Sequence, residues 1–153
     1  LIADEPTTAL DATTQAEILA LLSDLRRRLG MALLLISHDL GLLRWHTERV
    51  VIMYAGHSVE SGKTAEVLTH PAHPYTSGLV QAARLARRPD GHFSMIGGDV
   101  PELEQAARLC PFLPRCEAAL PRCRMAMPPM LSAGAAGHDA RCWRLECEER
   151  AVP

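Results

Sequence analysis

The sequence predicts an α/β fold in which parallel strands alternate with helices, followed by a small cysteine-rich segment. In the first 60 residues, apolar runs typical of buried strands flank a stretch with helical periodicity, and polar turns separate these elements. A strand, a helix and a strand in this order give two parallel strands, because the crossover helix returns the chain to the starting edge. A further observation is that all five cysteines lie in the last third of the chain.

The first helix is predicted over residues 12–29, where apolar residues recur at three- and four-residue steps. Asp11 or Thr13 can cap its N-terminus, and Gly30 can end it by adopting the left-handed conformation. Residues 1–3 are interpreted as the end of a buried strand. The unbroken apolar run at residues 32–36 predicts a second strand that is covered on both faces.

Beyond residue 36 the pattern changes from parallel to antiparallel. A short helix is predicted through Trp45, and strands over residues 49–54 and 58–60 are joined by a turn at residues 55–57. We expect this hairpin to form an antiparallel edge of the parallel sheet.

The rest of the chain is organised differently. Short helices are predicted over residues 64–69 and from His73-Pro74-Tyr75 to about Leu85, because proline suits the first turn of a helix. Residues 87–100 contain several glycines and a proline and are interpreted as a linker. The tail, roughly residues 109–147, is dense in proline and too short to build its own core, so we expect a metal or another staple to hold it.

Composition narrows the class of protein. The 153 residues are 48% hydrophobic and 22% charged, as in a soluble globular protein. The net charge of -2 gives no reason to expect a nucleic-acid partner, and no apolar run approaches the roughly 20 residues that span a bilayer. The chain starts at Leu1, inside an apolar segment, so we expect a truncated N-terminus. With no export signal, the cysteines should stay reduced.

Asp4 and Glu5 are two adjacent carboxylates at the C-terminal end of a predicted buried strand. Such strand ends are where α/β sheets hold their ligands. The first carboxylate can hold Mg²⁺ through its water shell, and the second can polarise an attacking water. A bare Asp-Glu pair is more often a solvated turn, so the flanking residues decide between these two interpretations.

Residues 1–11 (LIADEPTTALD) resemble, almost residue for residue, the Walker B and D-loop segment of ABC-transporter ATPases. His38, inside the segment LISHDL at a predicted strand end, resembles the switch histidine of the same family. The resemblance implies the C-terminal part of a P-loop NTPase, with the parallel sheet and helices of an ABC ATPase. It also implies that Asp4 assists Mg²⁺ binding and that Glu5 is the general base or water-orienting residue. His38 would contact the γ-phosphate of ATP, and Asp11 would signal across a dimer of ATPase subunits.

Later segments narrow the family. Residues 51–56 (VIMYAG) and 59–62 (VESG) resemble the terminal hairpin of ABC ATPases. Residues 70–76 (HPAHPYT) resemble the signature of the oligopeptide, dipeptide and nickel import ATPases, which carry an extra C-terminal domain. Without the family, this segment is only a helix that starts at a proline, and we assign it a structural role. The resemblance divides the chain into residues 1–62, part of the ABC ATPase domain, and residues 63–153, the C-terminal domain.

The family resemblance implies the ATP-hydrolysing, energy-coupling subunit of a peptide-class ABC importer, with ATP and Mg²⁺ as its cofactors. Its partners would be a second ABC ATPase subunit in a homo- or heterodimer, transmembrane permease subunits and, indirectly, an external solute-binding protein. It would lie peripherally on the cytoplasmic face of the bacterial inner membrane, and no nucleic acid is expected. The solute, whether a dipeptide, an oligopeptide, nickel or glutathione, does not touch the ATPase, so the sequence does not select one.

The cysteine tail suggests a metal centre. Four cysteines are separated by 5, 6 and 18 residues, and four thiolates in a core-poor segment can close around one metal: Cys110, Cys116, Cys123 and Cys142. A zinc site would satisfy the same ligands, although the usual C-x₂₋₄-C spacing is absent, and unliganded thiols are a third interpretation. The segments CPFLPRC and GHDARC resemble the family's C-terminal domain, which implies a [4Fe–4S] cluster on these four cysteines. Cys147 is left over as the spare.

The chain has no G-x-x-x-x-G-K-[ST] phosphate loop, and its single lysine, Lys63, lacks the upstream glycines. The Leu-Ser-Gly-Gly signature of the family is also absent. We therefore expect no ATPase activity from this chain alone and assign the function to a full-length parent. One alternative is a soluble ABC ATPase of DNA repair or translation, against which residues 70–76 and the cysteine tail argue. Another is a metal-binding remnant with a degenerate ATPase part, against which the intact Asp4, Glu5, Asp11 and His38 argue.

Overall fold

The computed structural model describes residues 1–84, 96–99 and 108–149, without the side chains of residues 147–149. The chain forms two compact units, Leu1–Glu48 and Arg49–Pro153. The predicted linker at residues 87–100 lies outside the described residues except for residues 96–99, and so does Leu85. The side chain of Cys147, the predicted spare thiol, is also outside them.

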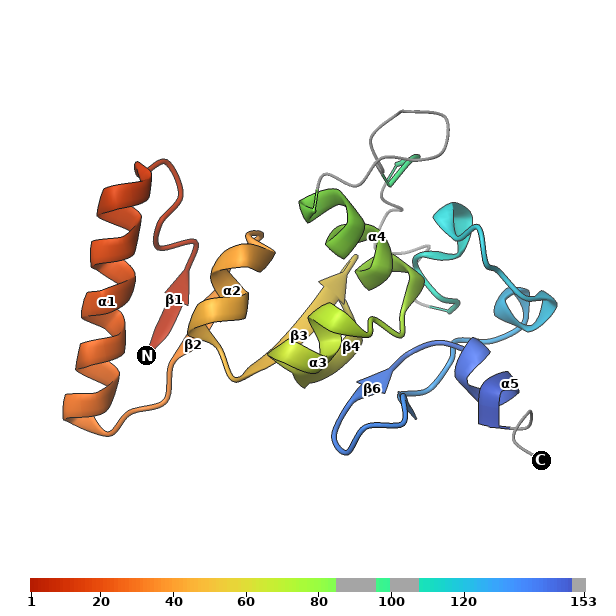
Figure 1. The fold of residues 1–153 in the computed structure, drawn as a ribbon. Helices are drawn as coiled ribbons and strands as arrows, with labels where there is room; N and C mark the ends of the chain where they lie inside the picture. The colour runs from red at the N-terminus through yellow and green to blue at the C-terminus, as the bar shows by residue number, and fades with distance from the viewer. Residues whose placement is uncertain (85–95, 100–107, 150–153) are drawn as a thin grey trace. The chain divides into compact units, whose positions relative to one another are not determined.

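The first unit is a β-α-β-α segment. It contains β1 (Ile2–Asp4), α1 (Ala12–Leu29), β2 (Leu34–Ile36) and α2 (Leu40–His46) (Figure 1). The two strands pair in parallel, with Asp4 opposite Ile36, as the strand-helix-strand order predicted. The parallel register therefore brings the C-terminal ends of both strands to one edge.

Helix α1 has the predicted bounds because both of its ends carry strong local signals. The carboxylate of Asp11 accepts hydrogen bonds from the backbone amides of Thr13 and Thr14, at 3.0 and 3.1 Å. Asp11, not Thr13, is therefore the cap. Gly30 has a φ of 60°, and its amide donates to the carbonyl of Arg26, which ends the helix in the left-handed conformation.

The expectation that the second strand is covered on both faces is wrong for this unit. Leu35 is buried, but Leu34 and Ile36 remain 57% and 44% exposed. Side chains alternate across a strand, so only the face that carries Leu35 is packed.

The second unit contains an antiparallel sheet with the strand order β3-β4-β6-β5. Its strands are β3 (Arg49–Tyr54), β4 (His57–Lys63), β5 (Leu131–Ser132) and β6 (Asp139–Ala140). The hairpin of β3 and β4 was expected at the edge of the parallel sheet, and this is wrong: within the described residues it belongs to a separate sheet. The reason is that β4 pairs with β3 on one side and with β6 on the other.

Helices and 3₁₀ turns complete this unit. They are α3 (Thr64–Thr69), α4 (Pro74–Ala83), η2 (Leu113–Arg115), η3 (Pro121–Arg124) and α5 (Arg144–Glu149). The first two confirm the helices predicted at residues 64–69 and after His73. No helix within residues 1–84, 96–99 and 108–149 has the length and apolar character that crossing a bilayer requires.

The core of the second unit is shared between the hairpin and the cysteine-rich tail. Val50, Ile52 and Tyr54 are buried along β3, and the register shifts between Ile52 and Met53. At this irregularity both Val59 and Glu60 of β4 are buried, although neighbours on a strand normally face opposite sides. The tail adds its own buried apolar residues to this core: Phe112, Ala140, Cys142, Trp143 and Leu145.

Candidate functional site

Asp4 and Glu5 lie at the edge where the parallel strands end. Asp4 is the last residue of β1 and is exposed, and the amide of Glu5 donates to the carbonyl of Ile36 at 3.0 Å. Glu5 has a φ of 46°, a left-handed conformation that non-glycine residues seldom adopt. Such a conformation is held by its surroundings and is found mainly at functional sites.

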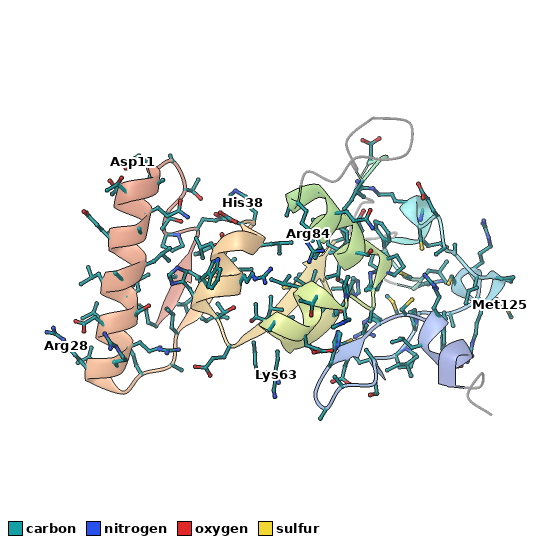
Figure 2. The ribbon with its side chains drawn as sticks, viewed as in Figure 1. Asp11, Arg28, His38, Lys63, Arg84 and Met125 are labelled. Carbon is teal, nitrogen blue, oxygen red and sulfur yellow. The ribbon has the colours of Figure 1, made fainter. Side chains whose placement is uncertain are left out.

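His38 lies beyond the end of β2 (Figure 2). Its ring contacts the Glu5 carboxylate. Nδ1 of His38 is 2.9 Å from Oε1 of Glu5, and the backbone amide of His38 donates to the same oxygen at 3.1 Å. The hydroxyl of Thr8 donates to Oε2 of Glu5 at 2.6 Å. The structure thus brings together two site residues that are 33 positions apart in the sequence.

These contacts set the charges of the pair. The hydrogen bonds from Thr8 and then from His38 lower the pKa of Glu5 below its ordinary value of 4.5. The hydrogen bond with Glu5, followed by its negative charge, raises the pKa of His38 above 6.5. The side chain of His38 is 79% exposed and that of Glu5 is 37% exposed, so both can reach a ligand from solvent. The arrangement offers an ionised carboxylate and an adjacent hydrogen-bond donor.

Asp11 is not part of this pair. Its carboxylate caps α1 and also accepts a hydrogen bond from the Thr14 hydroxyl at 2.8 Å. The hydrogen bonds from Thr14 lower the pKa of Asp11 below 3.8. The side chain remains exposed, and its predicted role in signalling between subunits stays a prediction.

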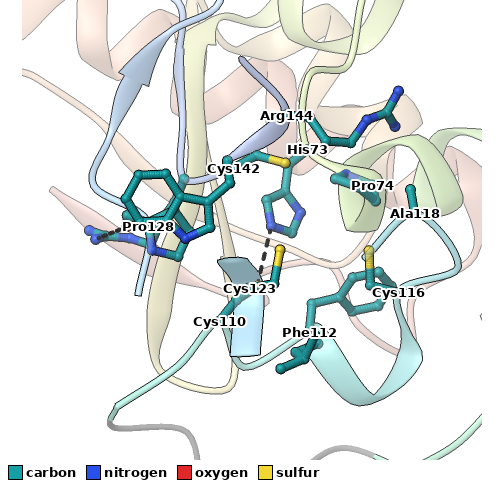
Figure 3. A pocket seen from close by; sticks show the side chains of 13 residues that line it. His73, Pro74, Cys110, Phe112, Cys116, Ala118, Cys123, Pro128, Cys142 and Arg144 are labelled. Atoms are coloured by element: carbon teal, nitrogen blue, oxygen red, sulfur yellow. Dashed lines mark hydrogen bonds between the residues drawn. The ribbon is translucent and has the colours of Figure 1, made fainter. Parts of the chain in front are cut away.

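The four predicted metal ligands of the tail line one pocket in the second unit (Figure 3). The space inside the pocket is small, about 20 Å³. A cavity needs at least about 10–15 Å³ on this measure to hold a water molecule, so the pocket as it stands has room for about one. Its other walls include His73, Phe112 and Trp143.

The thiols of this pocket are free and are not arranged as ligands. Within residues 1–84, 96–99 and 108–149, no group of three or more His, Cys, Asp or Glu side chains is placed so that it could hold a metal ion. Burial raises the pKa of Cys110 to about 11, and the neighbouring cysteines add to the rise. Burial also raises the pKa values of Cys116 and Cys142. These three thiols are thus protonated at neutral pH, and a metal would have to displace their protons.

A buried polar network lies beside this pocket, and the sequence interpretation missed it. Glu60 is fully buried, and its two oxygens accept hydrogen bonds from the amides of Ala72 and His73, both at 2.8 Å. Nε2 of His138, also buried, lies 2.7 Å from Oε1 of Glu60. The sequence did indicate that Glu60 could be a special residue. A carboxylate next to Val59 in a short strand must be either exposed to solvent or paired with hydrogen-bond donors. Its partners could not be found locally.

His73 connects the network with the cysteines. It caps α4, with Nδ1 accepting a hydrogen bond from the amide of Tyr75 at 3.1 Å. Nε2 of the same ring lies 4.0 Å from Sγ of Cys110. Burial lowers the pKa of His73 to about 4, so the ring is neutral at physiological pH. The segment His70–Thr76, to which we assigned a structural role, therefore also reaches the cysteine pocket.

Sequence comparisons relate the chain to known proteins. Residues 59–123 match the family described as the oligopeptide/dipeptide transporter, C-terminal region. Over 145 residues the chain is 45% identical to the probable peptide ABC transporter ATP-binding protein y4tR of Sinorhizobium fredii, covering 94% of this chain and 43% of that protein. It is 41% identical to the oligopeptide transport ATP-binding proteins OppD of Haemophilus influenzae and Salmonella typhimurium, covering 94% of this chain and 44% and 42% of theirs. The chain thus spans less than half the length of these curated relatives.

Proposed function

We propose that this chain, which belongs to the family of ATP-binding proteins of peptide ABC transporters, carries the water-activating and γ-phosphate-facing side of an ATP hydrolysis site. The observation that carries the proposal is the pairing of Glu5 with His38 at the ends of two adjacent parallel strands. A phosphate group bound at this edge would meet the carboxylate and the imidazole together. The phosphate-binding loop that completes the site would come from the rest of the full-length protein.

Each residue of the edge has a separate role in this proposal. Asp4 would hold Mg²⁺ through its water shell, and the metal would neutralise charge on the phosphates. Glu5, kept ionised by its hydrogen bonds, would orient and polarise the attacking water. His38 would donate to the γ-phosphate, and its bond to Glu5 would hold the ring in place. Asp11, at the exposed start of α1, would contact the second subunit of an ATPase dimer.

The wider assembly is proposed from the family. The full-length protein would work as a peripheral subunit at the cytoplasmic face of the bacterial inner membrane, with a second ATPase subunit and transmembrane permease subunits. An external solute-binding protein would deliver a peptide or another small solute to the permease. Closure of the ATPase dimer on ATP would drive the transport cycle, and hydrolysis would reset it.

The test of the ATPase proposal is Glu5→Gln in the full-length protein. This change removes the acceptor charge with little change in shape, so we expect ATP turnover to fall by about 10²- to 10⁴-fold, the range typical of a lost general base. Glu17→Gln, on the exposed surface of α1, is the matched control and should retain turnover. Unchanged turnover in Glu5→Gln would show that the catalytic assignment is wrong.

His38 is tested in the same assay. His38→Ala should reduce ATP turnover while the protein still folds, because the ring is exposed and contributes little to the core. His46→Ala, at the exposed C-terminal end of α2, is the control. Equal turnover in the two variants would rule out a contact between His38 and the γ-phosphate.

We also propose that four cysteines of the second unit hold a metal centre, a [4Fe–4S] cluster with zinc as the alternative: Cys110, Cys116, Cys123 and Cys142. The support is that all four thiols line one pocket, and thiolates are the ligands that iron–sulfur clusters and zinc prefer. Binding would require the sulfurs to turn toward a common point. The centre would stabilise a tail that has few regular elements.

The metal proposal is tested by the metal content of the full-length protein, purified without oxygen. Wild-type protein should contain iron and absorb visible light, or contain one zinc. Cys116→Ser should lose this metal, whereas Cys147→Ser should keep it. Equal metal content in Cys116→Ser and wild type would refute the ligand assignment.

A further inference from the structure

Thr8 contacts the Glu5 carboxylate from within the same turn of the chain. Its hydroxyl donates a hydrogen bond to Oε2 of Glu5 at 2.6 Å. The two residues are the first and the fourth of a β-turn, in which the amide of Thr8 donates to the carbonyl of Glu5 at 3.2 Å. Pro6, the second residue, has a φ fixed near the value that this position requires. The hydroxyl therefore reaches the carboxylate without the help of a distant segment.

The turn is itself held by the fold of the first unit. At its start, the amide of Glu5 donates to the carbonyl of Ile36 at 3.0 Å, which ties the turn to β2. Further on, Thr7 is buried, and its carbonyl accepts a hydrogen bond from the amide of Leu10 at 3.2 Å. The left-handed φ of 46° at Glu5 persists because these surroundings hold it. The position of the Thr8 hydroxyl is therefore set by the backbone of the turn.

Donors occupy most of the acceptor positions of the Glu5 carboxylate. A carboxylate has about four such positions, two on each oxygen. Among the residues that the structure describes, Oε1 accepts from the amide of His38 at 3.1 Å and from Nδ1 of its ring at 2.9 Å. Oε2 accepts from the hydroxyl of Thr8. One position therefore remains for a further donor, and it lies on Oε2, beside Thr8.

We propose that Thr8 is a positioning residue for ATP hydrolysis, whose hydroxyl holds the Glu5 carboxylate so that the remaining acceptor position on Oε2 receives the attacking water. With His38 on Oε1 and Thr8 on Oε2, the carboxylate cannot rotate without losing a hydrogen bond. The water then meets an acceptor that is already oriented, which lowers the cost of reaching the reactive geometry. Thr8 acts through Glu5 and touches neither ATP nor the water. This inference rests on the proposed ATPase function.

Three substitutions separate the hydroxyl of Thr8 from the shape of its side chain. Thr8→Val keeps the branched shape without the hydroxyl, Thr8→Ala removes both, and Thr8→Ser keeps the hydroxyl. Because Thr8 is exposed, none of these changes disturbs the core. Thr13→Val, the same change at an exposed position of α1, is the matched control. The readouts are kcat and KM for ATP in the full-length protein, and Thr8→Val is also made in the Glu5→Gln background.

We expect Thr8→Val and Thr8→Ala to lower kcat by about 10- to 100-fold, because a misplacement of about 1 Å can cost about 100-fold in rate. KM for ATP should not change, since the hydroxyl does not bind ATP. Thr8→Ser and Thr13→Val should stay close to wild type. In the Glu5→Gln background, Thr8→Val should lower kcat no further, because residues that act as one unit are not additive.

The outcomes that contradict the inference differ from those that contradict the proposed function. Wild-type kcat in Thr8→Val, an equal loss in Thr8→Ser, or a loss confined to KM would overturn the role of Thr8. An equal effect of Thr8→Val in the wild-type and Glu5→Gln backgrounds would also overturn it, because Thr8 would then not act through Glu5. Wild-type turnover in Glu5→Gln would overturn the catalytic assignment itself, and this inference with it.

Discussion

Glu60 is the residue whose replacement should affect the second unit most. Its carboxylate is fully buried and is shared by three donors: the amides of Ala72 and His73, and Nε2 of His138. A buried donor left without a partner costs about 1–3 kcal/mol, and Glu60→Ala removes the acceptor of all three donors. Glu60→Ala should therefore destabilise the unit by at least about 3 kcal/mol. This is a large part of the roughly 5–15 kcal/mol by which a domain is stable.

Glu60→Gln is the finer perturbation, because it keeps one acceptor oxygen and replaces the other by an amide group. The NH₂ must then face one of the three donors, and the lost charge-assisted hydrogen bond corresponds to about 1.5–3 kcal/mol. Since each 1.4 kcal/mol is a factor of about ten, the amides that depend on this network should exchange hydrogen about 10- to 150-fold faster.

The assay is hydrogen exchange measured by mass spectrometry, on peptides that cover residues 57–76. Glu66→Gln is the matched control, because its side chain is 38% exposed and its pair with His70, 3.4 Å apart, should contribute less than about 1 kcal/mol. Exchange in Glu60→Gln no faster than in Glu66→Gln would refute the view that the network holds the unit together.

Two further predictions concern the first unit. Glu5→Gln should lower the pKa of His38 toward 6.5 in an NMR titration, because the raised value depends on the Glu5 carboxylate. A His38 pKa that is unaffected by the substitution would contradict the pairing. The stabilisation due to His38 is present below pH 6.5 and is lost as the pH rises through the raised pKa of His38. The stabilisation due to Glu5 is present above pH 4.5 and is lost as the pH falls through the lowered pKa of Glu5. Asp11→Ala should destabilise the protein to thermal unfolding by about 0.5–2 kcal/mol, whereas Asp11→Asn should be nearly neutral, because asparagine also caps helices. Equal stability of the two would show that the cap contributes nothing.

The parts of the fold that sequence could predict are those with local signals. Helix α1 was predicted with its bounds because its periodicity, the cap at Asp11 and the glycine at Gly30 all lie within the same 20 residues. The parallel pairing of β1 and β2 followed from the order of the elements. Glu5 and His38 were predicted to form a site from their motifs, and the structure places them in contact at the shared edge of the two strands; their role stays a prediction.

The parts that sequence could not predict depend on contacts between distant segments. The pairing of β6 with β4 places Ala140 opposite Glu60, and no local pattern indicates this partner. The register shift between Ile52 and Met53 turns Glu60 inward against the alternation of the strand. The hairpin of β3 and β4 was expected in the wrong sheet because the pairing of β4 with β6 also joins segments that are distant in the sequence. His73 was given only a structural role, because the sequence does not show that it lies near Cys110. This proximity depends on how the tail folds.

The pairing of Glu60 with His138 also has a consequence for synthesis on the ribosome. The two residues are separated by 78 positions, and translation at about 5–20 residues per second makes Glu60 roughly 4 to 16 seconds older than its partner. During this interval the edge of β4 that β6 will cover is without that partner, and an open edge can pair with another chain. The nascent chain therefore passes through a period in which this edge is open to pairing with other chains, and this period ends only when His138 and β6 have left the exit tunnel.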